Sequence, residues 1–410
     1  MFRADAETPL MDTAGSTEHT SDAILERVRA LAPALRARAG QAERDRCIPT
    51  ETIDDFRATD MFRMMQPKNF GGFEMDFAAG IRVQMEIGKS CASSAWVGGL
   101  GITHQWLIAN FPLQAQEDVW RDNSGAIAFG SYSAPNRAEP VDGGFLATGN
   151  WAFSSGCDHG QWALLGITFP ADDEHENPYP GLMLAPESDY GFDDDWHTVG
   201  LAATGSKTIV CDRMFVPDHR RIAFTNSLVG ESPGSKIHDN PLYRLPLLAM
   251  LPFTLTAPII GALDGAIEDF IADHGSRLTR GAVGSGGSNL GSYAGVQTRL
   301  ADACGALDAA KLMTFRCLDE TFGVAKAGEP VTIDMRIRNR LAHGYTVKLA
   351  LDAINGLYAA TGGAGLYTNS RIQRAWRDIT AASHHVSLNW DALSTLFGQH
   401  VLGLNPKGSF

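Results

Sequence analysis

A serine-rich corner is the stretch of this 410-residue chain best suited to hold a ligand by hydrogen bonds. Residues 145–166 read FLATGNWAFSSGCDHGQWALLG, with Ser154 and Ser155 adjacent and followed by glycine. A strand that breaks into a Ser-Ser-Gly corner can direct hydroxyl and backbone N–H groups at a bound molecule. The alternative is that both serines only satisfy a turn, as serine often does.

Histidines supply the candidate proton-transfer groups, because imidazole titrates near neutral pH. His104 lies in GITHQWLIANF beside Trp106, on a segment that could wall an aromatic pocket. His384 and His385 are adjacent, so on a helix they would point about 100° apart and only one could face a given site. Each histidine could instead be a packed or surface residue. The pair has no partner four residues away, so we expect no metal site.

Periodicity in the sequence divides the chain into blocks that must position these residues. Residues 21–123 have mainly helical spacing, and residues 124–225 alternate apolar and polar residues with period two. A connecting loop at 226–242 is rich in Pro, Gly and Ser, and helical spacing returns over 243–410. We expect residues 1–20 to form a flexible tail. Blocks without strand–helix alternation predict an α+β architecture.

Capping residues give expected limits for the first helices. The sequence predicts one continuous helix over residues 21–45, with Ser21 or Asp22 as its N-cap. Asp76 is the expected N-cap of a third helix, and Pro112 suits the start of a later helical turn.

Composition excludes several classes of function. A net charge of −13 and a pI near 5.3 argue against a nucleic-acid partner, which requires a basic face. The six cysteines form no CxxC pair, which favours reduced thiols and a cytoplasmic location. The N-terminus has no apolar run typical of a signal peptide or membrane anchor. Neither GxxxxGK[ST] nor a GxGxxG after a strand is present, so no dinucleotide fingerprint is predicted.

Several stretches together resemble the acyl-CoA dehydrogenase fold, over roughly residues 20–403. They are PKNFGGFEMD before the third helix, VDGGFLATGNWAFSSG in the β block, MFVP at its end, SRLTRG in the first long C-terminal helix, and ATGGAGLYTNSRIQRAWRD. The resemblance implies an N-terminal helical domain, a central β-barrel-like domain and a C-terminal four-helix bundle, assembled as a homotetramer.

One position separates the branches of that family. Acyl-CoA dehydrogenases usually carry a catalytic glutamate nine residues after the Arg of an Arg-Asp pair, and that position is Val386 here, with His385 just before it. The other known location for the base, within residues 240–263, has no acidic residue; Asp264 and Glu268 follow it. The pattern instead resembles flavin-dependent monooxygenases of the same fold, the oxygenase components of two-component phenol hydroxylases. Enzymes acting on p-hydroxyphenylacetate and in steroid degradation are examples.

This resemblance implies a reaction and its partners. Reduced flavin, FADH2 or FMNH2, would react with O2 to a C4a-hydroperoxyflavin that hydroxylates a phenolic or indolic substrate. A separate NAD(P)H flavin reductase would deliver the reduced flavin. Dehydrogenation of an acyl-CoA with FAD, N- or S-oxidation, and non-catalytic flavin binding remain alternatives.

The resemblance and the local sequence assign roles to individual residues. We expect catalysis to involve His104, His385 and Ser155. The expected cofactor contacts are Ser131, Ser154, Ser155, Arg277, Gly362, Gly363 and Gly365, with Arg277 at the phosphate end, often across a subunit boundary. The expected substrate contacts are His104, Trp106, Ser131, Tyr132, Ser206 and His385.

Overall fold

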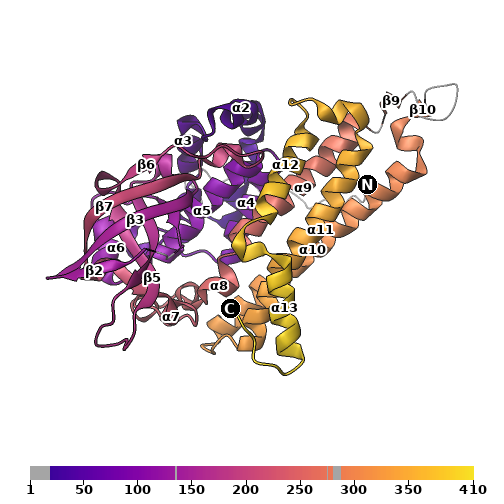
Figure 1. Ribbon diagram of the computed structural model, residues 1–410. Helices are drawn as coiled ribbons and strands as arrows, with labels where there is room; N and C mark the ends of the chain where they lie inside the picture. The colour runs from indigo at the N-terminus through magenta and orange to yellow at the C-terminus, as the bar shows by residue number, and fades with distance from the viewer. Residues whose placement is uncertain (1–18, 134–135, 275, 280–287) are drawn as a thin grey trace, which may run out of the picture.

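The computed structural model describes residues 19–133, 136–274, 276–279 and 288–410, arranged as helices, strands and helices in chain order (Figure 1). The expected tail, residues 1–20, therefore lies almost entirely outside the described residues. The first block consists of helices α1 (Ser21–Ala30), α2 (Ala32–Asp45), α3 (Thr50–Ala58), α4 (Phe77–Gly88), α5 (Ala92–Ile108) and α6 (Leu113–Trp120).

The first predicted helix is wrong in its continuity and in its cap. The chain breaks at Leu31, because Pro33 at the start of α2 has no N–H to donate to the preceding turn. The N-cap of α1 is Thr20, whose hydroxyl accepts from Ala23 N at 3.2 Å. The predicted cap of the third helix is confirmed, since Asp76 accepts from Ala79 N at 2.7 Å.

The central block consists of two four-stranded sheets packed around a core of their own. The sheets have the orders β1-β4-β5-β8 and β2-β3-β7-β6, and only β1 and β4 run parallel. Their inward residues, such as Trp151, Phe145 and Phe169, are fully buried between them. The strands are β1 (Ala128–Ser131), β2 (Ala138–Val141), β3 (Gly144–Ser154), β4 (Trp162–Phe169), β5 (Tyr179–Pro186), β6 (Gly191–Asp193), β7 (Lys207–Pro217) and β8 (Arg221–Ala223).

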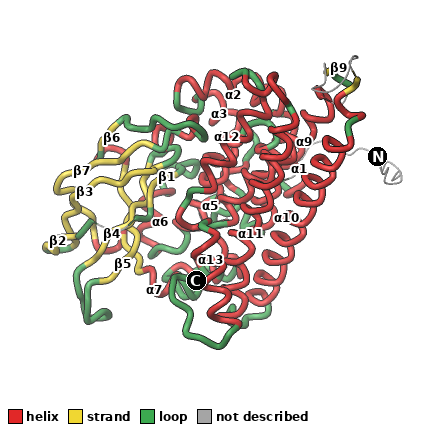
Figure 2. The backbone as a smooth tube through the Cα atoms, turned by 45° about the vertical axis from the view of Figure 1, so that its right-hand side comes forward, coloured by secondary structure: helices red, strands yellow, loops and turns green. Residues whose placement is uncertain are grey.

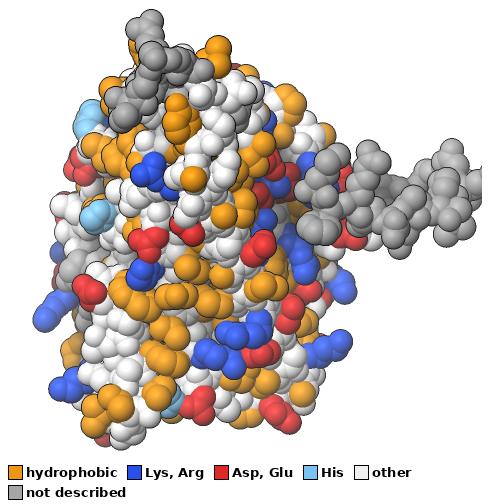
Figure 3. Space-filling model, turned by 90° about the vertical axis from the view of Figure 1, so that its right-hand side faces the viewer, with side chains coloured by type: hydrophobic (Ala, Val, Ile, Leu, Met, Phe, Trp, Pro, Cys, Tyr) orange, Lys and Arg blue, Asp and Glu red, His pale blue; other side chains and the backbone are white. Residues whose placement is uncertain are grey.

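Long helices dominate the C-terminal block and lie side by side (Figure 2). Apolar side chains are scattered over the outer face on the side of α10 (Figure 3). Residues 276–279, the described part of the SRLTRG stretch, do not lie in a helix: α9 ends at His274, and Leu278–Thr279 forms a short strand. The elements are α7 (Phe224–Ser227), α8 (Leu247–Met250), α9 (Phe253–His274), β9 (Leu278–Thr279), β10 (Ser288–Asn289), α10 (Ala294–Lys326), α11 (Ile333–Ala360), α12 (Arg371–Ser383) and α13 (Trp390–Val401).

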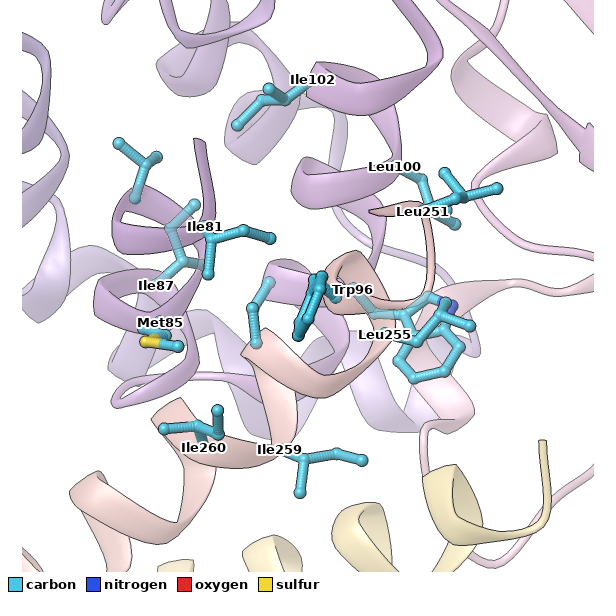
Figure 4. Packing of buried hydrophobic residues seen from close by; sticks show 14 of the residues in the cluster. Ile81, Met85, Ile87, Trp96, Leu100, Ile102, Leu251, Leu255, Ile259 and Ile260 are labelled. Atoms are coloured by element: carbon cyan, nitrogen blue, oxygen red, sulfur yellow. The ribbon is translucent and has the colours of Figure 1, made fainter. Parts of the chain in front are cut away.

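Helices α4, α5 and α9 form the core that joins the first and last blocks (Figure 4). The backbones of α4 and α9 approach closely at glycines, and a Cβ on Gly261 would lie 2.2 Å from the Met85 carbonyl oxygen. The segment Leu247–Asp273 is apolar and long enough to cross a membrane, but 94% of its most hydrophobic window is buried. It is therefore a core helix in this fold.

A buried carboxylate ties the central block to the C-terminal helices. Asp378 of α12 accepts a hydrogen bond from Leu201 N at 2.7 Å, and burial raises the pKa of Asp378 to about 6. Arg374 and Arg377, from the same helix, both bind Glu43 of α2. These contacts fix the loop between β6 and β7 against α12, which determines where the serine-rich corner faces.

Candidate active site

The serine-rich corner lies where β3 ends and the chain turns toward α5. Ser155 is buried, and its hydroxyl accepts a hydrogen bond from Trp96 Nε1 of α5 at 3.2 Å. The turn continues through Gly156, whose φ of +75° favours glycine and where a Cβ would lie 2.8 Å from Val97. The corner is therefore packed tightly against α5.

Three hydroxyls in this corner form a chain with a defined direction. Ser155 and Ser206 are 2.7 Å apart, Ser206 and Thr204 are 2.6 Å apart, and Thr204 donates to the Leu201 carbonyl at 2.8 Å. Because Thr204 donates its only hydroxyl hydrogen to the Leu201 carbonyl, it must accept from Ser206. Ser206 in turn accepts from Ser155. The Trp96 indole can only donate. The remaining capacity of Ser155 is therefore an acceptor lone pair, which suits an N–H group of a ligand.

The two other candidate serines differ from Ser155. Ser154 is fully buried, and its hydroxyl donates to the Trp151 carbonyl at 2.9 Å within the turn. Ser131 is the last residue of β1, where it pairs with Leu165 of β4 and is buried. Cofactor contacts by Ser154 and Ser131 remain predictions, and the packing favours a turn role for Ser154.

His104 is completely buried on α5, with both ring nitrogens bonded. Its Nδ1 lies 2.7 Å from the Ala128 carbonyl oxygen, so Nδ1 carries the hydrogen and Nε2 accepts from the Tyr132 hydroxyl. Burial lowers the pKa of His104 to about 4 and raises the pKa of Tyr132. A ligand would therefore meet His104 through Tyr132 rather than directly.

His385 lies beyond the end of a helix, not within one as the sequence analysis assumed. Helix α12 ends at Ser383, His384 is exposed, and His385 caps the turn that follows. The half-buried His385 ring lies 5.9 Å from the Trp96 ring. Burial, and then the charge of Arg340, lower the pKa of His385 to about 4.

The tautomer of His385 follows from its neighbour. Its Nδ1 lies 3.1 Å from Ser387 N, and a backbone N–H can only donate. Nδ1 is therefore the acceptor, and in the neutral ring the hydrogen lies on Nε2. His385 thus offers a donor, while Val386 is 83% exposed and carries no acid–base group.

Trp96, with the leucines near it, forms an apolar wall beside this donor and the acceptor of Ser155. Trp96, Leu100, Leu251 and Leu255 keep between 5% and 7% exposure, whereas Ile81 and Ile102 deeper in the same cluster have none (Figure 4). These four residues therefore keep a small accessible surface, unlike the deeper core. Their apolar side chains would exclude water beside the donor and the acceptor.

Trp106 and the glycine-rich stretch have structural contacts of their own. Trp106 is buried, donates to the Leu242 carbonyl at 2.8 Å, and packs edge-on against Phe77. A Cβ on Gly365 would lie 1.9 Å from the Thr361 hydroxyl, so close packing requires glycine there. A substrate contact by Trp106 and a cofactor contact by Gly365 remain predictions that this packing does not favour.

Arg277 and Gly362 lie together, as their predicted shared role requires. Arg277 donates to the Thr361 carbonyl at 2.7 Å, and a Cβ on Gly362, whose φ is +61°, would lie 3.9 Å from the same guanidinium. Gly363 has open space where a side chain would be. The remaining N–H groups of the Arg277 guanidinium suit a phosphate group.

Four further residues are not predicted from the sequence: Trp96, Thr204, Arg340 and His343. Arg340 and His343 are one turn apart in RNRLAHG on α11, and both are buried. No periodic signal marks them, since an Arg and a His on a long helix usually face solvent. Trp96 could have been suspected from its place in an otherwise small-residue helix, ASSAWVGGLG.

The two acidic residues that follow the alternative location of an acyl-CoA base, Asp264 and Glu268, are engaged in ion pairs. Asp264 binds Lys89 and Lys311, and Glu268 binds Lys89 and Arg36, so both carboxylates are in ion pairs. Within the described part of the chain, no cluster of His, Cys, Asp and Glu could hold a metal ion.

Family models match both ends of the chain. Residues 18–121 match the acyl-CoA dehydrogenase N-terminal domain, and residues 253–390 match the C-terminal domain. A crystal structure of the 3-HSA hydroxylase from Rhodococcus sp. RHA1 superposes with a TM-score of 0.88 at 31% identity, covering 94% of this chain and 98% of that one. The chain belongs to the acyl-CoA dehydrogenase family, and its predicted fold class is confirmed.

Individual relatives define the branch within that family. The chain is 38% identical to the oxygenase component of FADH(2)-dependent resorcinol hydroxylase from Rhizobium sp. (strain MTP-10005), over 94% of this chain and 96% of that protein. It is 33% identical to the flavin-dependent monooxygenase oxygenase subunit HsaA from Rhodococcus jostii (strain RHA1), over 93% and 98%. XiaF from Streptomyces sp., solved with FADH2 and glycerol, superposes with a TM-score of 0.86 at 26% identity, covering 95% and 98%. The chain is thus a member of the flavin-dependent monooxygenases, an oxygenase component.

Proposed function

We propose that this protein uses reduced flavin and O2 to hydroxylate a phenolic or indolic compound, with a separate NAD(P)H flavin reductase supplying the flavin. The observation that carries the proposal is that an acceptor at Ser155 and a donor at His385 both lie against Trp96. The resorcinol hydroxylase and indole-3-acetate monooxygenase named among the relatives act on aromatic compounds of these kinds.

The residues of the serine-rich corner fit a reduced flavin. Ser155, oriented by Ser206 and Thr204, has an acceptor free for a flavin N–H, and the Arg277–Gly362 corner suits its phosphate end. Reduced flavin, when bound, supplies the two electrons that activate O2. These contacts do not distinguish FAD from FMN, so the choice between them remains open.

The chain's own side chains would orient the substrate and keep water out. The aromatic ring would pack against Trp96 and the adjacent leucines, and His385 Nε2–H would donate to the hydroxyl oxygen of a phenolic substrate. Tyr132, held by His104, would contact the substrate from the side of β1. Substrate roles for Ser131 and Ser206 remain predictions, and Ser206 acts on the ligand only through Ser155 in this geometry.

Supplying chemically reduced FAD or FMN, O2 and a panel of phenols and indoles tests the proposal. We expect one oxygen atom from ¹⁸O2 in the product, detected by mass spectrometry. Release of hydrogen peroxide alone with every aromatic tried would contradict it. Reduction of bound FAD by an acyl-CoA would instead support the dehydrogenase alternative.

The homotetramer is proposed from the outer face of the C-terminal helices (Figure 3). Leu312 on α10 is 73% exposed, and Leu366 and Leu402 are exposed to a similar extent. Apolar side chains in such positions are typical of a subunit interface. Mass photometry should give four subunits, and Leu312→Glu should shift the protein to smaller species. A cytoplasmic location is proposed with it, in keeping with six free cysteines.

A further inference from the structure

The hydroxyl chain that orients Ser155 ends on a single atom, the carbonyl oxygen of Leu201. Thr204 donates to that oxygen at 2.8 Å, and the chain runs back through Ser206 to Ser155. With the Leu201 oxygen in place, Ser155 gives its hydrogen to Ser206 and keeps a lone pair for a ligand. Without it, Thr204 would be free to donate to Ser206 and Ser206 to Ser155, and the Ser155 hydrogen would face the ligand. The position of one backbone oxygen therefore decides whether Ser155 offers an acceptor or a donor.

The backbone of Leu201 has a conformation that needs support from its surroundings. Its φ is +51°, in the left-handed region that residues other than glycine rarely occupy. Gly200, just before it, lies so close to α12 that a Cβ would be 2.2 Å from the Arg377 carbonyl oxygen. Residues in such conformations persist only where neighbouring groups fix them. The contacts between this turn and α12 therefore hold the Leu201 carbonyl in place.

Asp378 of α12 makes the contact on which the turn depends most. Its carboxylate accepts from Leu201 N at 2.7 Å, whereas Trp196, which donates to the Leu201 carbonyl at 3.1 Å, belongs to the same loop. Arg377 donates to the Val199 carbonyl at 2.8 Å, but Val199 is 75% exposed, so water can replace that bond. Asp378 is 5% exposed, and loss of its carboxylate would leave the Leu201 N–H buried without a partner.

Burial of the Asp378 carboxylate is not balanced by an ion pair within the described part of the chain. The guanidinium groups of Arg374 and Arg377, on the same helix, bind Glu43 instead. Burial therefore raises the pKa of Asp378, although the bond from Leu201 N and the charge of Arg377 oppose the shift. A buried carboxylate without an ion pair contributes poorly to stability. This favours a role for Asp378 in the site that it supports.

We propose that Asp378 is a positioning residue for the flavin reaction, because it holds Leu201 where the hydroxyl chain makes Ser155 an acceptor. This inference rests on the proposed function, in which Ser155 accepts from an N–H group of reduced flavin. Asp378 acts through the backbone of Leu201 and the hydroxyl chain, and it touches neither flavin nor substrate. No covalent bond forms or breaks at Asp378.

The preference of the site for reduced over oxidised flavin reports the direction of the chain. Reduced flavin carries a hydrogen on N5 and oxidised flavin does not, so an acceptor at Ser155 favours the reduced form and a donor favours the oxidised form. Ultrafiltration of the full-length protein gives dissociation constants for anaerobic reduced FAD and for oxidised FAD, with FMN in a parallel series. We expect wild type to bind reduced FAD more tightly. The ratio of the two affinities needs no turnover, and a general loss of binding does not change it.

Substitutions of Asp378 should change this ratio in a defined order. Asp378→Ala removes the acceptor for Leu201 N and should lower the preference for reduced FAD about tenfold. Asp378→Asn keeps an oxygen that can accept from Leu201 N, and its ratio should stay within about twofold of wild type. Asp378→Leu removes the acceptor but fills the space of the side chain, and it should match Asp378→Ala. If Asp378→Ala does not fold, Asp378→Leu carries the test.

Asp269 of α9 provides a matched control. It is also a buried carboxylate and lines the same small cavity as Asp378, but its partner is Arg371 rather than the loop. Asp269→Ala should alter stability and leave the ratio of affinities unchanged. A double variant tests the route, because Asp378→Ala should lower the ratio no further when Ser155→Ala is already present.

Each other outcome also decides the question. Equal weakening of both flavin forms in Asp378→Ala and Asp378→Leu would overturn the proposal and give Asp378 a role in folding alone. An equally low ratio in Asp269→Ala or in Asp378→Asn would overturn it too, as would additive effects of Asp378→Ala and Ser155→Ala. A wild-type protein without a preference for reduced FAD would remove the acceptor at Ser155 and the proposal with it. The expected ratios in a protein that hydroxylates no aromatic compound would reject the proposed function alone.

Discussion

His104 and Arg340 are both buried polar residues near the candidate active site, and they differ in how completely they are bonded. His104 has the Ala128 carbonyl on one nitrogen and the Tyr132 hydroxyl on the other. Arg340, with His343 one turn away, has buried N–H groups that bond nothing in the described chain. Folding alone satisfies the first region, whereas the described residues leave the buried polar atoms of the second without partners. Buried groups of the second kind are stronger candidates for binding than those of the first.

The largest effect is expected at His385, whose Nε2–H is available to a ligand because its Nδ1 accepts from Ser387. His385→Ala should lower hydroxylation about 100-fold, because the donor to the ring oxygen is lost. Reduced-flavin oxidation should continue, with oxygen released as hydrogen peroxide. The amounts of hydroxylated product and of hydrogen peroxide formed per flavin oxidised measure hydroxylation and flavin oxidation. The exposed neighbour is the control, and an equal loss in His384→Ala would contradict the assignment.

Removing His104 should have the opposite pattern, because it belongs to the satisfied region. His104→Ala leaves the Ala128 carbonyl and the Tyr132 hydroxyl without partners, which should lower the free energy of unfolding by about 1–3 kcal/mol. Urea denaturation measures this change. A stable variant that binds reduced flavin but loses hydroxylation would instead give His104 a direct role in catalysis, and the contrast with His385 would disappear.

The Ser155 acceptor should matter for coupling as well as for stability, because Ser155→Ala also leaves the Trp96 indole N–H without its partner. Ser155→Ala should raise the fraction of oxygen released as peroxide severalfold and weaken reduced-flavin binding, because the acceptor for the flavin N–H is lost. Ser154→Ala, which loses only a turn hydrogen bond, is the matched control. Similar uncoupling in the two variants would remove Ser155 from the flavin site.

The pH dependence of hydroxylation should reflect the burial of His385 and, after it, the charge of Arg340. With a pKa of about 4, His385 stays neutral above roughly pH 5, so its acid limb should lie near pH 4 rather than near the ordinary 6.5. Removing the positive charge in Arg340→Met should move this limb to higher pH. Single-turnover rates between pH 4 and 8 measure the position of this limb. A limb that does not move would show that the charge of Arg340 does not act on His385.

The smallest effect is expected at Trp106, which is bonded as completely as His104. Trp106→Phe removes the bond to the Leu242 carbonyl but keeps most of the packing, so the free energy of unfolding should fall by about 1 kcal/mol. Product per flavin oxidised should not change. A fall in coupling would restore Trp106 as a substrate contact.

Local signals in the sequence were sufficient for the block order, for the Asp76 cap and for the serine-rich corner. They failed where distant segments meet. The break at Pro33 was read as continuous helix, and SRLTRG was placed inside a helix that ends before it. Trp96 was missed because its bond to the corner crosses between blocks. Thr204 was missed because it acts through Ser206, which lies 51 residues from Ser155 along the chain. The predicted domain boundaries and subunit assembly stay predictions.

By itself, the sequence determined the α+β blocks and the family, and it placed His385 where a dehydrogenase of this family would have its base close by. Only the tertiary structure decided what these groups offer a ligand. The free lone pair of Ser155 depends on Thr204 and Leu201, and the donor at His385 depends on Ser387. The burial of Arg340 results from helices packing around it. Hydrogen-bond direction and desolvation depend on neighbours in space, which residue spacing along the chain does not reveal.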